Sequence, residues 1–312
     1  MRCFLKYTVA TRRSALARCQ TDLFISTFTD QHPDVAFTVQ NMTTAGDQTM
    51  GSIANLKDAF VGELESALLR GEVRCAVHSL KDMSVSHQES LTIGAVLPRH
   101  DPRDVFLSVN YACLSDLPNG AIVGTSSARR CAQIKAHHPL LEVKRCRGNV
   151  PTRINQLKTG DFDAIVLAVA GIERLGMIGE LKIDRLAIDR YTPACGQGAI
   201  AIQCRDDDTV LCQQLRSINH RSSYDLVMLE REIVRQFGAH CGMPLGVHIA
   251  KRPDDQLAVY VFVGSLDGQK VIQRQALWSN NLSVDSGIIK QFVESVLSAG
   301  ARDIFAGCQG DL

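Results

Sequence analysis

Residues 121–130 read AIVGTSSARR, an apolar run followed by a polar turn and then by a basic segment. The run from Ala121 to Gly124 predicts a strand, and Thr125-Ser126-Ser127 predicts the turn that ends it. We expect a helix to follow as far as His138-Pro139 and a second strand to begin at Leu141. This order of strand, helix and strand is typical of an α/β fold.

The same order occurs near the N-terminus. A strand is expected at Tyr7–Ala10, a turn at residues 11–14, a helix up to His32-Pro33, and a strand at Val35–Val39. The second halves of the two units also match, because residues 69–77 and 159–169 each pass from a turn into an apolar run. Chance similarity between two such units is the alternative to an internal repeat. Two α/β lobes that face each other would form a cleft for a ligand.

The last third of the chain predicts a small α+β domain. A charged amphipathic helix at Ser223–Phe237 ends at Gly238, and Asp267-Gly268 is a turn signal between two strands. Strands are expected at Leu245–Ile249, Leu257–Val263 and Val271–Leu277, and a final helix at Ser283–Ser298. The predicted domains are a first lobe of residues 1–98 and 196–216, a second lobe of residues 99–195, and a C-terminal domain of residues 217–312.

The composition narrows the class of protein. A chain of 312 residues with 45% hydrophobic and 21% charged residues is globular rather than disordered. A net charge of +1 argues against a nucleic-acid-binding protein and against a polybasic membrane anchor. The 11 cysteines include no CxxC pair, which predicts reduced thiols and no metal site. We expect a cytoplasmic protein, because no apolar run resembles a signal peptide or a membrane span.

Basic residues gather between positions 121 and 153, where Glu142 is the single acid. A solvated helix face would explain any one of them. Several, however, lie at turns between strands and helices, where free backbone N–H groups favour anions. Guanidinium groups bind carboxylates with paired hydrogen bonds, and no phosphate-binding glycine motif accompanies them, so a polycarboxylate ligand is favoured over a nucleotide. The seven basic residues are Arg129, Arg130, Lys135, Lys144, Arg145, Arg147 and Arg153.

Three further positions are candidates for chemistry. Arg12 lies beside Ser14 at the turn that corresponds to residues 125–127. Lys81 and Asp82 follow the strand that begins near Cys75; they form either a local ion pair or a site where the carboxylate stabilises a developing cation. Cys241 lies between Gly238 and Gly242, which predicts an exposed loop, and its role there is either none or that of a modified or nucleophilic thiol.

Seven motifs occur in an order that is known from one enzyme family: ATRRSALA at 10–17, HSLKD at 78–82, DPRDVF at 101–106, VGTSSARR at 123–130, RGNVPTR at 147–153, LAVAGIERLG at 167–176 and PACGQGA at 193–199. Together they resemble the porphobilinogen deaminase family, also called hydroxymethylbilane synthase. The resemblance covers nearly the whole chain.

The resemblance implies two periplasmic-binding-protein-like α/β lobes and a small α+β C-terminal domain. It implies a transferase of tetrapyrrole (haem) biosynthesis that joins four porphobilinogen units head to tail on a dipyrromethane cofactor and releases hydroxymethylbilane. By the same resemblance the cofactor is held by a thioether at Cys241. The implied catalytic residues are Asp82, Lys81 and Arg12. The implied cofactor contacts are Asp82, Lys81, Ser14, Thr125, Ser126, Arg129, Arg130 and Arg147, and the implied substrate contacts are Arg12, Arg147, Arg153, Arg174 and Gln197.

One region departs from the family pattern. The mobile loop that is usually rich in glycine is shorter here, over residues 46–60, and Asp58-Ala59 precedes Phe60. Lys57 and Phe60 are predicted lid contacts.

The partner expected from the resemblance is porphobilinogen; neither nucleic acid nor a membrane is expected, and the chain is expected to be a monomer. Two alternatives stay open. The first is a non-catalytic two-lobed binding protein for a small polycarboxylate anion, and the second is a family member with impaired turnover.

Overall fold

The computed structural model describes residues 5–42, 53–86, 88–177, 179–238, 242–284 and 286–307, and for residues 53–60 it describes the backbone alone. The chain divides into two compact units. Unit 1 runs to His100 and takes in Gly198–Val227, and unit 2 consists of Asp101–Gln197 and the chain from Met228 onward. The chain therefore passes between the units after His100, after Gln197 and within the helix that contains Val227.

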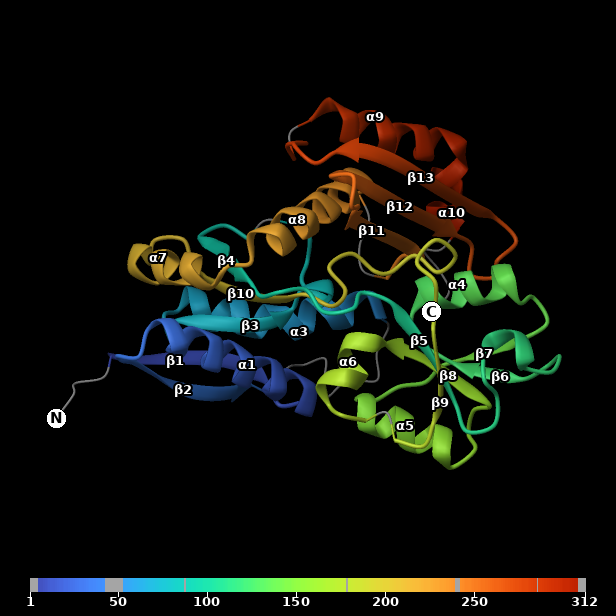
Figure 1. Cartoon of the computed structure of the whole chain (residues 1–312), viewed down its shortest axis with the longest axis horizontal. Coiled ribbons are helices and arrows are strands. Elements are labelled where there is room, and N and C mark those ends of the chain that lie inside the picture. Colours follow the sequence, from blue (N-terminus) through green and yellow to red (C-terminus); the bar gives the residue numbers. More distant parts are fainter. Residues whose placement is uncertain are drawn as a thin grey trace. The chain divides into compact units, whose positions relative to one another are not determined.

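Unit 1 is built on a five-stranded sheet with the order β2-β1-β3-β10-β4 (Figure 1). The strand β1 pairs in parallel with β2 and β3, whereas β10 is antiparallel to both of its neighbours. β10 is the last of these strands in the sequence, and it follows the segment Asp101–Gln197 of unit 2. The strands are β1 (Leu5–Arg12), β2 (Val35–Met42), β3 (Cys75–Ser79), β4 (Leu91–Val96) and β10 (Ile200–Arg205).

Helices cover both faces of this sheet, as the alternation of side chains in its strands requires. Val9 and Val77 pack with Phe24 of α1 (Ala15–Gln31) and with Leu211 of α7 (Thr209–Ile218). Their neighbours Ala10 and Ala76 face the opposite way and pack with Leu64 and Leu68 of α3 (Ile53–Leu69). A sheet buried on both faces explains why consecutive residues are apolar within its strands, as at Val9–Ala10, Cys75–Val77 and Ile200–Ile202.

Unit 2 contains a second five-stranded sheet with the order β7-β6-β8-β5-β9. Its parallel strands β6, β7 and β8 take the places that β1, β2 and β3 take in unit 1, and β5 is the antiparallel strand that corresponds to β10. One face packs against α4 (Ala128–His137), and the other against α5 (Val150–Lys158) and α6 (Val169–Arg174). The strands are β5 (Asp104–Ser108), β6 (Ile122–Gly124), β7 (Glu142–Lys144), β8 (Ala164–Ala168) and β9 (Lys182–Arg185).

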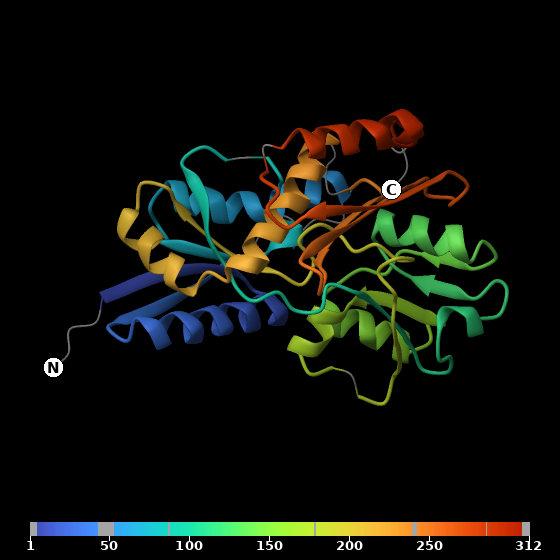
Figure 2. The ribbon, with the colours of Figure 1, turned by 45° about the horizontal axis from the view of Figure 1, so that its top comes forward.

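A third, antiparallel sheet of three strands lies in unit 2, with the order β11-β12-β13. Helix α4 contacts β11 and β12, so it lies between this sheet and the second five-stranded sheet (Figures 1 and 2). The approach is close at Gly268, where a Cβ atom would lie 2.3 Å from the backbone nitrogen of Ala136. The elements are α8 (Arg221–Gln236), β11 (Leu245–Lys251), β12 (Gln256–Gly264), β13 (Val271–Ser279), α9 (Gly287–Val296), a π turn (Leu297–Ala301) and α10 (Arg302–Gly307).

The α/β class, the repeated strand order and the small C-terminal sheet are confirmed. The final helix begins later than predicted, at Gly287, because the side chain of Ser286 caps it by accepting from the backbone N–H of Ile288. The division into three domains at residues 98, 195 and 216 stays a prediction. Within the described residues no helix has the length and apolarity to cross a membrane.

Candidate functional site

The turn between β6 and α4 is set by two short polar side chains. The Ser127 hydroxyl caps α4 by accepting from the backbone N–H of Arg130 at 3.5 Å, and the Thr125 hydroxyl accepts from the backbone N–H of Ser127 at 3.2 Å. Ser126 donates to the carbonyl oxygen of Cys146 at 2.8 Å, which connects this turn to the segment that follows β7. The sequence therefore starts the helix at Ala128 and places Arg129 and Arg130 in its first turn.

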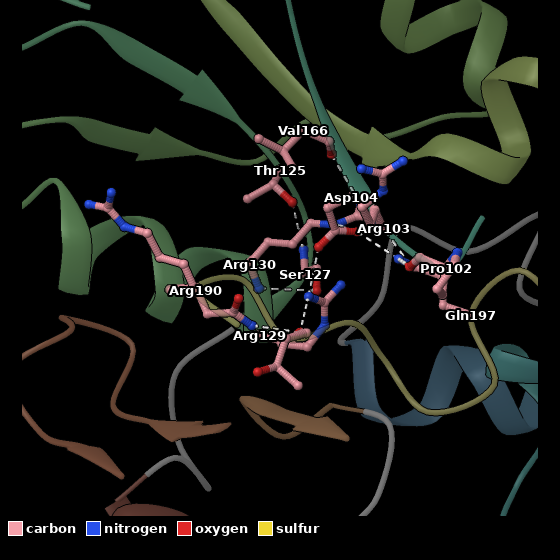
Figure 3. A network of polar contacts seen from close by, with 12 residues as sticks. Pro102, Arg103, Asp104, Thr125, Ser127, Arg129, Arg130, Val166, Arg190 and Gln197 are labelled. Atoms are coloured by element: carbon pink, nitrogen blue, oxygen red, sulfur yellow. Dashed lines mark hydrogen bonds and ion pairs between the residues drawn. The ribbon is translucent and has the colours of Figure 1, made fainter. Parts of the chain in front are cut away.

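Both arginines turn inward onto one carboxylate, that of Asp104 at the start of β5 (Figure 3). Arg129 donates from Nη1 to Oδ2 of Asp104 at 2.7 Å. Arg130 donates from Nη2 and from Nε to Oδ1 of Asp104, at 2.8 and 3.1 Å. Gln197 donates from Nε2 to the same Oδ1 at 2.8 Å and to the carbonyl oxygen of Pro102 at 2.7 Å. We call these four side chains, Asp104, Arg129, Arg130 and Gln197, the Asp104 cluster.

The Asp104 cluster holds more positive than negative charge. Its three charged side chains are at most 9% exposed, and they comprise two guanidiniums and one carboxylate. Burial alone would raise the pKa of Asp104, but the charges and hydrogen bonds of the two arginines outweigh it and hold that pKa well below its usual value. Burial lowers the pKa of Arg129, although a guanidinium remains protonated at neutral pH. One positive charge is thus left over for an anion.

Arg129 also has hydrogen-bonding capacity to spare. Its bonds to Asp104 and to the carbonyl oxygen of Thr192 both come from one terminal nitrogen. Its Nε is buried and has no hydrogen-bond partner among the residues that the structure describes. A buried donor without a partner is costly, and a carboxylate ligand would satisfy it.

A second basic turn follows β7. Gly148 has a φ of 105°, and Asn149 caps α5 by accepting from the backbone N–H of Thr152 at 3.0 Å. Arg147 precedes this glycine, and Arg153 donates from Nε back to its carbonyl oxygen at 2.7 Å. Arg153 is thus tied to the backbone directly after Arg147, and both side chains stay partly exposed.

Two of the seven predicted basic residues have structural partners instead. Lys135 donates to the carbonyl oxygens of Pro139 and Leu141, beyond the end of α4. Lys144 pairs with the exposed Glu142 at 3.2 Å. For these two residues the structure supports a local role.

In unit 1, the polar residues gather at the carboxyl end of β1 and β3. These strands are parallel neighbours, and Ala10 lies opposite Ala76, so Arg12 at the end of β1 lies level with His78. Lys81 and Asp82 belong to a short 3₁₀ turn, Leu80–Asp82, that directly follows β3. The carboxyl ends of parallel strands are where α/β proteins usually bind ligands.

His78 is a buried neighbour of this edge. His78 is 6% exposed, and burial is the main cause that lowers the pKa of its imidazole from 6.5 to about 4. Asp82 raises that pKa and Arg12 lowers it, so both charges act on the imidazole. Next to it, Gln203 of β10 donates to Glu65 of α3 at 2.8 Å. The imidazole is therefore neutral at physiological pH.

The segment that leads into Gln197 is anchored by a buried acid from α8. Glu230, which is fully buried, accepts from the backbone N–H of Gly196 and from that of Ile249 in β11, both at 2.8 Å. It therefore joins α8 and β11, which precede and follow Cys241 in the sequence, to the backbone beside Gln197. Cys241 itself lies outside the described residues, as do the side chains of Lys57 and Phe60.

The structure brings Arg129, Arg130 and Gln197 together in unit 2, and Arg12, Lys81 and Asp82 to one sheet edge in unit 1. Ser14 caps α1 by accepting from the backbone N–H of Ala17 at 3.2 Å, and Arg174 lies at the end of α6. The assigned roles of all these residues stay predictions. Sequence reasoning missed Asp104, although an acid at the start of the apolar run Val105–Leu107 is a signal for a buried ion pair.

Comparison with known proteins shows the family. Residues 7–213 match the family described as "Porphobilinogen deaminase, dipyromethane cofactor binding domain". The chain belongs to the porphobilinogen deaminase family. The porphobilinogen deaminase of Thiobacillus denitrificans is 39% identical over 301 residues, which cover 95% of this chain and 97% of the relative. That of Bacillus pumilus is 35% identical over 308 residues, which cover 97% of both chains.

Among solved structures, a probable amino-acid ABC transporter extracellular-binding protein from Bacillus subtilis matches this porphobilinogen deaminase family member with a TM-score of 0.44 and 14% identity, covering 74% of this chain and 97% of that one. The VFT2 domain of Bordetella pertussis BvgS matches with a TM-score of 0.45 and 16% identity, covering 71% and 91%.

Proposed function

We propose that this protein is a working porphobilinogen deaminase: a cytoplasmic, monomeric transferase that joins four porphobilinogen units on a covalent dipyrromethane and releases hydroxymethylbilane. The observation that carries the proposal is the Asp104 cluster, which has one buried positive charge in excess and a buried guanidinium N–H without a described partner. A chain of pyrroles with carboxylate side chains supplies the anions that such a cluster requires.

The residues present fit a dipyrromethane. Arg129 and Arg130 would hold its carboxylates, Arg147, Ser14, Thr125 and Ser126 would contribute further contacts, and Cys241 would form the thioether. When bound, the dipyrromethane supplies the pyrrole end to which the first porphobilinogen is joined. Arg12, Arg153, Arg174 and Gln197 would hold substrate carboxylates. Lys57 and Phe60 would act as lid contacts.

In this proposal Asp82 is the catalytic carboxylate. Loss of ammonia from porphobilinogen leaves positive charge on a pyrrole ring, and a fixed carboxylate lowers the energy of that charge. Asp82 is suited to this because the hydrogen-bonded turn Leu80–Asp82 follows β3 directly and the neighbouring His78 is neutral. Lys81 and Arg12, at the carboxyl ends of β3 and β1, would bind carboxylates of the substrate while Asp82 faces the ring N–H groups.

A mass measurement tests the cofactor claim. The purified active protein should have an intact mass above that of the polypeptide by the mass of a dipyrromethane, and Cys241→Ser should remove the addition. Cys19→Ser is the matched control, since it replaces another thiol that is neither buried nor assigned a role. An active protein with the bare polypeptide mass would overturn the covalent cofactor.

A turnover measurement tests Asp82. Asp82→Asn should lower kcat by about 10²–10³-fold while leaving the cofactor mass in place, because only the charge that stabilises the transition state is lost. Asp82→Glu should fall between that variant and the wild type. Full activity in Asp82→Asn would remove this residue from the mechanism.

Incubation with porphobilinogen separates the enzyme from a binding protein. The enzyme should release ammonia and form a product that develops porphyrin absorbance. Saturable binding without ammonia would favour the non-catalytic alternative, and slow ammonia release from protein with the full cofactor mass would indicate impaired turnover.

A further inference from the structure

Arg129 and Arg130 are consecutive residues of one helix, and this placement poses a geometric problem. Successive residues on an α-helix point about 100° apart. Two such side chains would normally diverge, one toward the sheet and one toward solvent. Here both are buried and both reach the same carboxylate group, one on each oxygen. Something other than the helix must therefore hold them together.

We infer that Asp104 is a positioning residue, which aims the guanidiniums of Arg129 and Arg130 at carboxylates of the bound oligopyrrole. The inference rests on the proposed function, since it concerns the ligand of the same arginines. Asp104 touches neither substrate nor cofactor in this account. It acts by fixing where the two cations lie.

Asp104 is itself held rigidly enough for this task. It lies on β5, which pairs with β8 on one side and β9 on the other, and its own carbonyl oxygen accepts from the backbone N–H of Leu186 at 2.9 Å. Its carboxylate is 1% exposed, and Oδ1 accepts a further bond from Gln197. The carboxylate cannot rotate without breaking bonds from three side chains. The position of β5 therefore determines where the two guanidiniums lie.

The remaining donors of the two arginines are directed by backbone oxygens. Arg129 donates to the carbonyl oxygen of Thr192 at 2.8 Å, and Arg130 donates to that of Val166 at 3.0 Å. Each guanidinium is thus fixed at two points, the Asp104 carboxylate and a backbone carbonyl. The N–H groups that remain have defined directions, which is what binding a planar carboxylate through paired hydrogen bonds requires.

Positioning and simple charge balance predict opposite results for Asp104→Asn, which keeps the shape of the side chain but removes its charge. If Asp104 only neutralised the cluster, its removal would leave two unbalanced cations and strengthen the binding of anionic ligands. If Asp104 positions the guanidiniums, the same change lets them separate under mutual repulsion. Cofactor loading should then fall, and KM for porphobilinogen should rise by about tenfold in the molecules that carry the cofactor.

The experiment compares wild type, Asp104→Asn and Asp104→Glu by intact mass, by KM and kcat of the loaded fraction, and by Tm. Asp104→Glu keeps the charge but moves it by one methylene group, so positioning predicts a KM between those of the other two proteins, whereas charge balance predicts the wild-type value. If Asp104→Asn does not fold, Asp104→Glu decides alone. Loading and KM equal to the wild type in both variants would overturn the inference.

Asp208→Asn is the matched control. Asp208 accepts two bonds from Arg74 in unit 1, at 2.6 and 2.9 Å, so its replacement also breaks a paired ion pair. It should lower Tm without changing loading or KM. Wild-type protein without added pyrrole mass would instead refute the proposed function, so the two failures are distinguishable.

Discussion

The two five-stranded sheets have the same strand order and yet hold charge in different ways. In unit 2, the described part of the sheet buries two arginines and one aspartate beside α4. In unit 1, Arg74 and Asp208 form a paired ion pair that stays partly exposed, at 28% and 10% of the side chains, while the buried His78 is neutral. The same strand order therefore does not determine the electrostatics of the two sheets; which residues are charged and how deeply their side chains are buried does.

The largest expected difference concerns the ion pairs. Arg130→Met should reduce the free energy of unfolding by about 1.5–3 kcal/mol, because it removes hydrogen bonds to a buried carboxylate that keeps Arg129 as its remaining counter-ion. Arg74→Met, which breaks the partly exposed pair, should cost about 1 kcal/mol. Urea denaturation of both variants at pH 7 measures the difference. Equal losses would show that burial does not distinguish the two units.

The buried His78 of unit 1 should make the free energy of unfolding depend on pH. The pKa of His78 is about 4 in the folded protein and near its usual 6.5 in the unfolded chain. Between these values the unfolded state binds more protons, so this contribution to stability is complete above pH 6.5 and is lost as the pH falls toward 4. From pH 6.5 to pH 5 the loss should be about 1.5 kcal/mol.

Urea denaturation at several pH values checks this prediction, and His78→Asn should flatten the slope over that window. His137→Asn in unit 2 is the comparison, because His137 is only partly buried and burial lowers its pKa less than it lowers the pKa of His78. Its effect on the slope should be smaller. The charges that act on His78 are those of Asp82 and Arg12, and a slope unchanged by His78→Asn would assign the pH dependence to other groups.

Much of the fold follows from local sequence. The apolar runs at Val35–Val39 and Leu257–Val263 lie inside strands, and Gly238, with a φ of 62°, follows the end of α8 as predicted. These features depend on neighbours within a few residues. Their boundaries differ from the prediction by a few residues because capping side chains such as Ser286 fix them.

The site is less predictable because its contacts are distant in sequence. The basic window 121–153 contains one acid, Glu142, which pairs with Lys144 and not with Arg129 or Arg130, and the sequence predicts that these two arginines contact a ligand. Their partner Asp104 lies 25 and 26 residues upstream, and it reaches them only because β5 pairs antiparallel with β8. Nothing in the local spacing indicates that strand pairing, so the excess charge was foreseen but its arrangement was not.

The smallest expected effect concerns the helix caps at corresponding turns of the two sheets. Ser14 caps α1 in unit 1 with a bond of 3.2 Å, whereas Ser127 caps α4 in unit 2 with a bond of 3.5 Å. Ser14→Ala should cost about 1 kcal/mol of stability, and Ser127→Ala about half of that, because the longer bond is weaker.

The turn before α4 is also less dependent on its cap, since Thr125 accepts from the backbone N–H of Ser127 whether or not a hydroxyl is present at residue 127. Denaturation of both alanine variants, with Ser14→Asn and Ser127→Asn as capping controls, measures the difference. If Ser127→Ala proved the more costly change, the first turn of α4 would depend on its cap rather than on the bonds of Arg129 and Arg130 to Asp104. The Asp104 cluster would then depend on the capped start of α4, and its bonds would add little to the stability of that first turn.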